Sequence, residues 1–266
     1  MFLLPDGPSH WLAIGQASHG LLAWQIARHW GARPFLRPAP AAETLAAVLL
    51  HDAGWTAFDA DPGVDAGGRP RTFDRMPAGQ HLAIWERSVA IAGAFSRYTG
   101  LLVAEHTLRL AGRKLEEARA AGDGGTAALT GAFAARLEAE IERSRNELAA
   151  DPRYGQALAG RGHAANGSIL AACDALAVLL CAAMPGPFTL TPSVRRGEAV
   201  PVTVRREDPR TLRLRPWPLE GRGLTIHAEG RRIEVRPYAA EALRTVLAAA
   251  PVERVSFRIL PPGAPA

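Results

Sequence analysis

Residues 169–184 of this 266-residue chain read ILAACDALAVLLCAAM, and no other stretch is as hydrophobic. Its apolar side chains cover every face of a helix rather than one stripe, which predicts a central buried helix over residues 166–184. A membrane span needs about 18 consecutive apolar residues, and Asp174 interrupts this run. We therefore expect the core helix of a protein that does not cross a membrane.

Asp174 is the only charged residue of this segment. A buried carboxylate costs several kcal/mol unless it is paired or bound to a metal ion. No Lys or Arg lies between Arg161 and Arg195, so the compensating charge must come from a remote part of the chain or from an ion. A salt bridge or a protonated carboxyl group stays open as the alternative to a metal site.

The sequence pattern changes at residues 185–187, which read PGP. Before them apolar residues recur at helical spacing, and after them short runs alternate between apolar and polar residues. We expect helices over 18–30, 45–52, 81–95, 100–110, 126–149 and 239–249, a long loop over 59–80, and strands over 200–204, 211–214, 224–227, 232–235 and 255–259. Gly230-Arg231 is expected to be a hairpin turn. The predicted fold is mainly α: a helical bundle domain over 1–185 and a small β-rich C-terminal extension over 186–266.

The net charge of +5 arises in the predicted extension, where residues 186–266 carry 14 arginines against 8 acidic residues, a balance of +6. Arginine commonly solvates the outer faces of strands, so we expect no nucleic-acid partner. Cys173 and Cys181 are about 12 Å apart along one predicted helix, too far for a disulfide. The N-terminus has no basic start and no apolar h-region, and the chain is expected to be cytoplasmic.

Four histidines and a second aspartate join the buried aspartate as candidate site residues. His51 and Asp52 end an apolar helical segment, His19 lies in the first predicted helix, and His81 and His106 lie in later helices. An imidazole and a carboxylate together suit a divalent cation with N and O ligands. A single buried histidine is more often a hydrogen-bonded core residue, so only the joint occurrence of these residues indicates a site.

The order His19, His51-Asp52, Asp174 resembles the H…HD…D signature of the HD-domain superfamily, which comprises all-helical metal-dependent phosphohydrolases. The chain resembles more closely an uncharacterised bacterial group, domain-of-unknown-function family 3891, from about residue 14 to residue 190, and we expect the resemblance to extend into the β-rich tail. The matching segments are QASH (16–19), AVLLHDAGW (47–55), GRP (68–70), MP (76–77), LLVAEH (101–106) and CDAL (173–176), with Cys181. This resemblance implies an HD-like helical bundle, and family 3891 itself brings no established reaction.

The superfamily resemblance also implies a metal site. One divalent ion (Mn, Mg, Fe, Co or Ni) would be held by His19, His51, Asp52 and Asp174. Four protein ligands leave two positions of an octahedron for water and substrate, the open arrangement that metal catalysis needs. His81 and His106 would either bind a second ion, or line the site and contact substrate phosphate.

Many HD hydrolases carry an acidic residue just after the HD pair, and this chain carries Ala53 there. The nearest acidic residues are Asp59 and Asp61, and we take Asp59, together with His106, as the candidate general acid or base. Arginine suits bidentate phosphate recognition, and an aromatic ring suits stacking on a base. The candidate substrate contacts are therefore Arg28, Arg69 and Trp55.

The expected function is a metal-dependent hydrolase in which a metal-activated water acts on a small phosphorylated molecule, a phosphate ester or nucleotide. Two alternatives stay open: a sensor module that binds metal or ligand without turnover, and a di-iron oxygenase, because HD-like scaffolds also host that chemistry. No G-x-x-x-x-G-K-[ST] or G-x-G-x-x-G loop occurs, which argues against a P-loop or dinucleotide fold. A homodimer is also left open.

Overall fold

The computed structural model describes residues 1–195 and 198–264 and contains helices at every predicted helical segment. Their bounds are α1 (Gln16–Ala27), α2 (Ala41–Leu50), the 3-10 turn η1 (Ala53–Trp55), α3 (Thr56–Ala60), α4 (Ala78–Phe95), α5 (Arg97–Ala120), α6 (Gly124–Ala149), α7 (Gly155–Ala159), α8 (Arg161–Cys181) and α9 (Ala240–Ala249). Side-chain caps mark two of the starts. Ser96 accepts a hydrogen bond from the Thr99 amide at the start of α5, and Asp123 accepts one from the Thr126 amide at the start of α6.

The strands form one mixed sheet of seven strands among the described residues. They are β1 (Phe2–Pro5), β2 (His10–Ile14), β3 (Phe188–Arg195), β4 (Glu198–Asp208), β5 (Thr211–Arg215), β6 (Leu224–Glu234) and β7 (Val252–Leu260). Their order across the sheet is β1-β2-β6-β7-β5-β4-β3. Only the β5–β7 pair is parallel within this described sheet, and the other neighbours are antiparallel.

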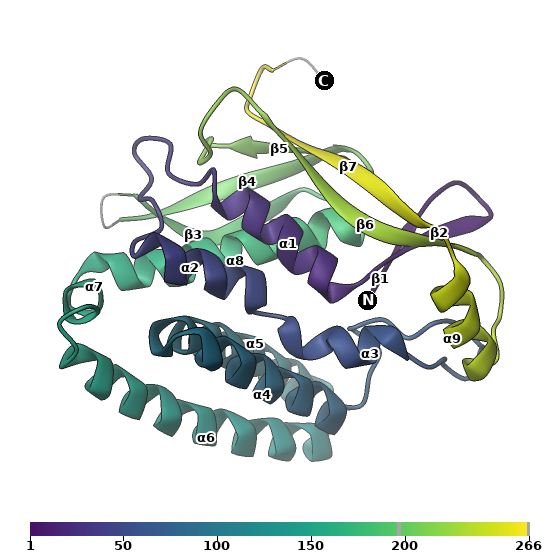
Figure 1. Ribbon diagram of the computed structural model, residues 1–266, viewed down its shortest axis with the longest axis horizontal. Helices are drawn as coiled ribbons and strands as arrows, with labels where there is room; N and C mark the ends of the chain where they lie inside the picture. Colours follow the sequence, from purple (N-terminus) through teal and green to yellow (C-terminus); the bar gives the residue numbers. More distant parts are fainter. Residues whose placement is uncertain (196–197, 265–266) are drawn as a thin grey trace.

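The helices stack on the sheet in two further layers (Figure 1). Helices α1 and α8 pack against strands β6 and β3, and α2 lies beside α1 and α8 on the side of the third layer. Helices α4, α5 and α6 form that third layer, with α5 packed on both α4 and α6. The middle layer, α1, α2 and α8, is thus covered by the sheet on one side and by helices on the other.

The expectation of a mainly α, HD-like bundle with a small β-rich extension is wrong. The seven-stranded sheet is a full layer of the molecule, so the chain has an α/β fold. Two of its strands, β1 and β2, come from the N-terminal part of the chain. They join the sheet because β2 pairs with β6, which places His10 opposite Glu234. Local periodicity cannot reveal a strand whose partner lies at the other end of the sequence. The division into domains at residue 185 stays a prediction.

The expected hairpin turn at Gly230-Arg231 is also wrong. Strand β6 continues through both residues, and Gly230 lies opposite Glu253 of β7. A Cβ atom at Gly230 would lie 3.2 Å from a side-chain carbon of Ile14 in β2. The glycine therefore permits close approach of the neighbouring strand, which is the other common reason for glycine inside a strand.

Helix α8 is the central buried helix that the hydrophobic segment 169–184 predicts. Leu170, Cys173, Leu176 and Leu180 are completely buried, and the helix contacts α1, α2, α5 and the sheet. Among the described residues, Gly162–Cys181 is the one helix long and apolar enough to cross a membrane, and 67% of that window is buried inside the protein. Such burial is typical of a core helix. The cytoplasmic location stays a prediction.

Candidate metal centre

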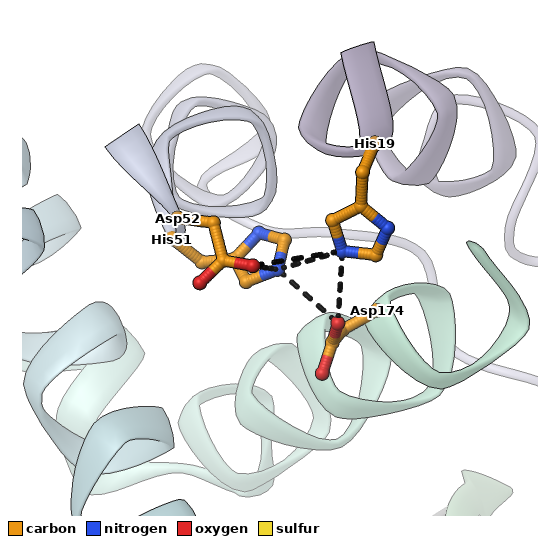
Figure 2. Close-up of side chains that lie close together, drawn as sticks. All are labelled: His19, His51, Asp52 and Asp174. Atoms are coloured by element: carbon orange, nitrogen blue, oxygen red, sulfur yellow. Dashed lines mark hydrogen bonds and ion pairs between the residues drawn. The ribbon is translucent and has the colours of Figure 1, made fainter. Parts of the chain in front are cut away.

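Four of the predicted site residues come together in the middle layer of helices (Figure 2). His19 projects from α1, His51 caps the C-terminus of α2, Asp52 precedes η1, and Asp174 projects from α8. One ligand atom from each residue lies within 4.8 Å of the corresponding atoms of the other three. Segments separated by up to 155 residues thus supply a single His–Asp group.

The distances within the His–Asp group match those expected around one ion. His19 Nε2 and His51 Nε2 are 3.3 Å apart, and they lie 3.1 and 3.2 Å from Asp174 Oδ1. Asp52 Oδ2 lies 3.7 Å from His19 Nε2 and 3.5 Å from His51 Nε2. An ion bound at about 2.1 Å places neighbouring ligand atoms about 3.0 Å apart in an octahedron and about 3.4 Å apart in a tetrahedron. The group could therefore hold a metal ion.

His51 is oriented for ligation by its own helix. Its side chain is buried, and Nδ1 donates a hydrogen bond to the Val48 carbonyl oxygen at 2.8 Å. This contact leaves the lone pair on Nε2, which faces the carboxylate of Asp174 and Nε2 of His19. Several acceptors that face one another in a buried site need a cation among them, either a proton or a metal ion.

The electrostatics of the group show the same need for positive charge. Burial alone would lower the pKa of His51, but the carboxylates of Asp52 and Asp174 raise it to about 9. Burial would raise the pKa of Asp174, but the three imidazoles around that carboxylate hold it well below its usual range. These shifts favour an ionised Asp174 beside a protonated His51, an ion pair in which the proton takes the place that a metal ion could occupy.

Two glycines allow the helices to bring these side chains together. A Cβ atom at Gly20, next to His19, would lie 2.6 Å from the Leu49 carbonyl oxygen of α2. A Cβ atom at Gly54 would lie 2.8 Å from Ser88 Oγ of α4, the atom that accepts a hydrogen bond from the Gly54 amide. Both close approaches exclude a larger side chain, so the glycines next to His19 and near Asp52 are required by the helix contacts.

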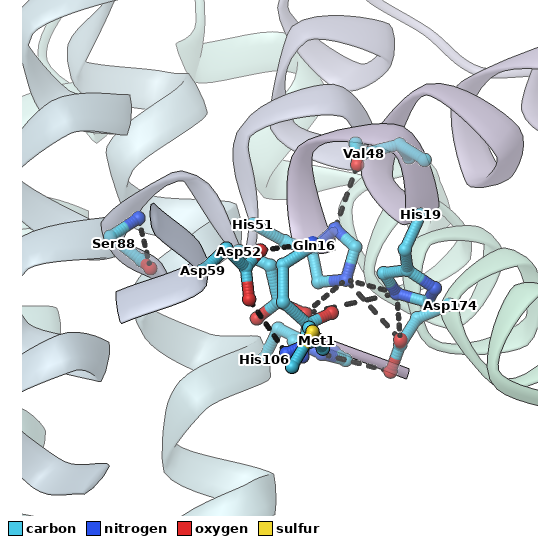
Figure 3. A network of polar contacts seen from close by, with 11 residues as sticks. Met1, Gln16, His19, Val48, His51, Asp52, Asp59, Ser88, His106 and Asp174 are labelled. Carbon is cyan, nitrogen blue, oxygen red and sulfur yellow. Dashed lines mark hydrogen bonds and ion pairs between the residues drawn. The ribbon is translucent and has the colours of Figure 1, made fainter. Parts of the chain in front are cut away.

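His106 lies beside Asp174 and His51, with its ring centroid 5.4 Å from that of His51 (Figure 3). Its Nε2 is 3.3 Å from Asp174 Oδ2, while Oδ1 faces His19 and His51. Burial, opposed by Asp174, lowers the pKa of His106 below the ordinary histidine value, so its ring is neutral at pH 7. The predicted roles of His106 as ligand or catalytic residue stay predictions, but the structure does place it against the group.

His81 is not one of the four residues of the His–Asp group, but it lines the same cavity as His51, Asp52 and Asp174. Its ring packs between the rings of Trp55 and Trp85, with ring centroids 5.1 and 4.3 Å away. Burial and the nearby charge of Lys114 lower the pKa of His81 to about 4. The ring is therefore neutral at pH 7, and it packs against two tryptophan rings. Its predicted part in binding a second ion stays a prediction.

Asp59 is engaged by other groups. The Met1 amino group lies 2.6 Å from Asp59 Oδ1, and the Gln16 amide donates to Oδ2 (Figure 3). The carboxylate thus links the start of β1 to the start of α1. Its predicted role as general acid or base stays a prediction, and both carboxylate oxygens already have partners within the protein.

The predicted substrate contacts fall in different places. Trp55 is buried and lines a cavity beside the His–Asp group. The guanidinium of Arg28 lies over the Trp24 ring at 4.7 Å, and that of Arg69 lies over the Trp11 ring at 5.2 Å. Neither arginine lines the cavity, so the structure does not bring them to the other predicted site residues.

The cavity has a volume of about 600 Å³ and includes His51, Asp52 and Asp174 in its wall. Its lining also contains Arg109 and Arg113, which the sequence analysis did not select. A signal for them was present, because they follow His106 by three and seven residues and therefore lie on the same face of α5. Helical spacing from the candidate histidine would have identified both.

These features define an α/β protein with a buried His–Asp group that could hold a metal ion. The chain belongs to the family described as "Protein of unknown function (DUF3891)", whose family model matches residues 3–235. No curated protein and no solved structure matches the chain. The resemblance to this family is thereby confirmed, whereas the resemblance to the HD-domain superfamily finds no support in these comparisons.

Proposed function

We propose that this protein is a metal-dependent hydrolase of phosphate esters. The observation that carries the proposal is the position of the His–Asp group, which lies in the wall of a cavity large enough for a small molecule. A purely structural ion site is normally closed by protein ligands on all sides, whereas a catalytic site keeps positions open toward a cavity.

The four residues of the group are suited to a hard or borderline divalent ion. Two imidazole nitrogens and two carboxylate oxygens are typical ligands of Mn, Fe, Co or Ni, with Mg as the oxygen-preferring alternative. A bound divalent ion would supply Lewis acidity, lowering the pKa of water and polarising a phosphoryl oxygen. The single compact group of four favours one ion over two.

His106 is the residue we assign to proton transfer. It is neutral at pH 7 and lies beside Asp174, so it can accept a proton close to the reacting group. Its Nδ1 is buried without a hydrogen-bond partner among the described residues, which leaves it available to a water or substrate group. Asp59 is a weaker assignment, because its carboxylate already binds the Met1 amine and the Gln16 amide.

The test combines metal analysis with turnover on a panel of phosphomonoesters and phosphodiesters. We expect about one divalent ion per chain and hydrolysis that requires it, with both lost in Asp174→Asn. His106→Gln should retain the ion and lose most of the turnover, because it keeps the ring's approximate size without its basicity.

Three results would contradict the proposal. Two redox-active irons with oxygen consumption would favour the oxygenase alternative. Bound metal without turnover across the panel would favour a sensor module. Turnover that survives chelation and the Asp174→Asn substitution would show that the His–Asp group is not the catalytic centre.

A further inference from the structure

The cavity beside the His–Asp group has one apolar part and one cationic part. Aromatic and aliphatic side chains from five elements and the loop before α4 form the apolar part: Phe2, Phe73, Trp85, Leu110, Val178 and Phe188. The volume of about 600 Å³ lies within the range of small-molecule sites, which is about 300–1,000 Å³. Such a wall favours a ligand with an apolar body over a fully polar one such as a sugar phosphate.

Arg109 and Arg113 supply the cationic part. Asp52 and Asp174 are the only acidic residues in the described lining, and both belong to the His–Asp group. Neither arginine forms an ion pair with a carboxylate within residues 1–195 and 198–264. Once an ion balances the two aspartates, the lining carries two unpaired positive charges, which an anionic ligand would complement.

The position of Arg109 is held by the neighbouring helix. Its guanidinium donates a hydrogen bond to the Gly167 carbonyl oxygen of α8 at 3.1 Å, and a Cβ atom at Gly167 would lie 3.4 Å from the same guanidinium. One N–H group is used in this way and the others stay available. Arg109 and Arg113 follow His106 by about 4.5 and 10.5 Å along the axis of α5, and both line the cavity, so the cationic part extends along α5 from the histidine that faces Asp174.

Unpartnered polar atoms provide independent evidence for a ligand. Gln16 Oε1, Trp55 Nε1 and His106 Nδ1 are buried without hydrogen-bond partners in the described part of the chain, and all three residues line the cavity. Buried polar atoms are nearly always satisfied, so these three indicate that waters or ligand groups bind there.

We propose that this cavity binds an amphiphilic anion: a phosphate ester or phosphonate whose charged head lies at Arg109 and Arg113 beside the ion and whose aryl or alkyl body fills the apolar part. The choice of an ester as substrate rests on the proposed function, whereas binding of the amphiphilic anion does not require turnover. The site thus discriminates against sugar phosphates and against neutral apolar compounds.

The test is calorimetric titration of the metal-loaded protein with three probes: methylphosphonate, 1-naphthylmethylphosphonate and 1-naphthalenemethanol. Phosphonates are not hydrolysed, so binding is measured apart from catalysis. We expect naphthylmethylphosphonate to bind at least roughly tenfold more tightly than either of the other two, because only it fills both parts of the cavity.

Variants assign the two parts separately. The double substitution Arg109→Gln and Arg113→Gln should weaken naphthylmethylphosphonate binding by roughly tenfold to hundredfold. Arg119→Gln, an exposed arginine near the end of the same helix, is the matched control and should change nothing. Val178→Phe, with Leu110→Phe as a second filling variant, should remove the advantage of the naphthyl group while methylphosphonate still binds.

Equal affinity for methylphosphonate and naphthylmethylphosphonate, or unchanged binding in the double arginine variant, would overturn this inference. Hydrolysis of the ester panel without preference for apolar esters would overturn it as well and leave the hydrolase proposal intact. Tight binding of naphthylmethylphosphonate without hydrolysis of any ester would support the amphiphilic-anion site and contradict the hydrolase proposal. Metal content and circular dichroism of each variant verify that it is folded.

Discussion

At the scale of single residues, the arrangement of the His–Asp group depends on the proton carried by Nδ1 of His51. The hydrogen bond from His51 Nδ1 to Val48 turns the Nε2 lone pair toward Asp174, and a cation must then lie among these acceptors. The sequence predicted this group well, because a charge in the most apolar helix needs compensation that few residue types can supply. It could not predict that Arg28 and Arg69 would stack on tryptophans elsewhere, since arginines are common and their contacts are not local.

Asp174→Asn should abolish metal binding. The amide keeps the size of the carboxylate but removes the charge that faces both histidines, so we expect at least roughly hundredfold weaker affinity. Elemental analysis after dialysis against the metal measures this directly. Asp61→Asn, an exposed carboxylate paired at 3.7 Å with Arg244, is the control and should retain full metal content. Full occupancy in Asp174→Asn would rule this residue out as a ligand.

His81 should make the protein sensitive to acid. Its pKa is lowered to about 4 by burial and by Lys114, so the unfolded state binds the proton more tightly than the folded state. The stability from the neutral ring is complete above pH 6.5 and is lost as the pH falls toward 4, by about 3 kcal/mol.

Urea denaturation of the wild type and His81→Phe, in chelator at several pH values from 7 to 4, measures this effect. The phenyl ring fits between the rings of Trp55 and Trp85 and cannot be protonated. The variant should therefore gain stability relative to the wild type as the pH falls. Parallel pH profiles for the two proteins would show that His81 is accessible to protons in the folded state.

At the scale of elements, the helices were predictable and the strands were only partly so. Amphipathic spacing is a local property, and each predicted helix is present, although α5 continues to Ala120. The strands β1, β2 and β3 were missed. A short apolar segment such as Phe2–Pro5 becomes a strand only through its pairing partners. The packing of one helix across another could not be predicted either, although the sequence does contain Gly20, the glycine at the contact between α1 and α2.

Gly20→Ala should destabilise the protein and weaken metal binding together. The added methyl group would lie 2.6 Å from the Leu49 carbonyl oxygen, so α1 and α2 must separate. Overpacking of this kind costs about 1–3 kcal/mol. Because His19 lies in α1 and His51 caps α2, the same movement would separate two residues of the His–Asp group.

Gly131→Ala in α6 is the matched control for this substitution. No atom lies within 4 Å of a Cβ placed there, and alanine in a helix is about 0.5–1 kcal/mol better than glycine. Urea denaturation and metal titration of both variants make the comparison. Equal stability of Gly20→Ala and the wild type would mean that the crossing adapts without cost, and unchanged metal affinity would mean that the ligands are not positioned by it.

At the scale of the whole molecule, the two ends of the chain share one sheet. Strand β2 pairs with β6, and Gln25 of α1 binds the backbone of β6 twice, through Nε2 to the His227 oxygen at 2.7 Å and through Oε1 from the His227 amide at 3.1 Å. The helix that carries His19 is therefore fixed to a strand near the C-terminus. The order of His19, His51-Asp52 and Asp174 in the sequence predicted that these residues come together, but it carried no information about the sheet on which α1 packs.

A fragment of residues 1–185 should consequently fail to fold on its own. Without β6, the β1–β2 hairpin loses its partner, and the buried side chains of Leu12, Leu22 and Ile26 lose their cover from the sheet. An isolated hairpin is marginal in water, so we expect weak circular dichroism, no cooperative urea transition and no metal binding. Adding the separate fragment 186–266 should restore part of the signal if the pairing of β2 with β6 drives assembly. A cooperative transition with full metal binding by residues 1–185 alone would instead establish them as an independent domain.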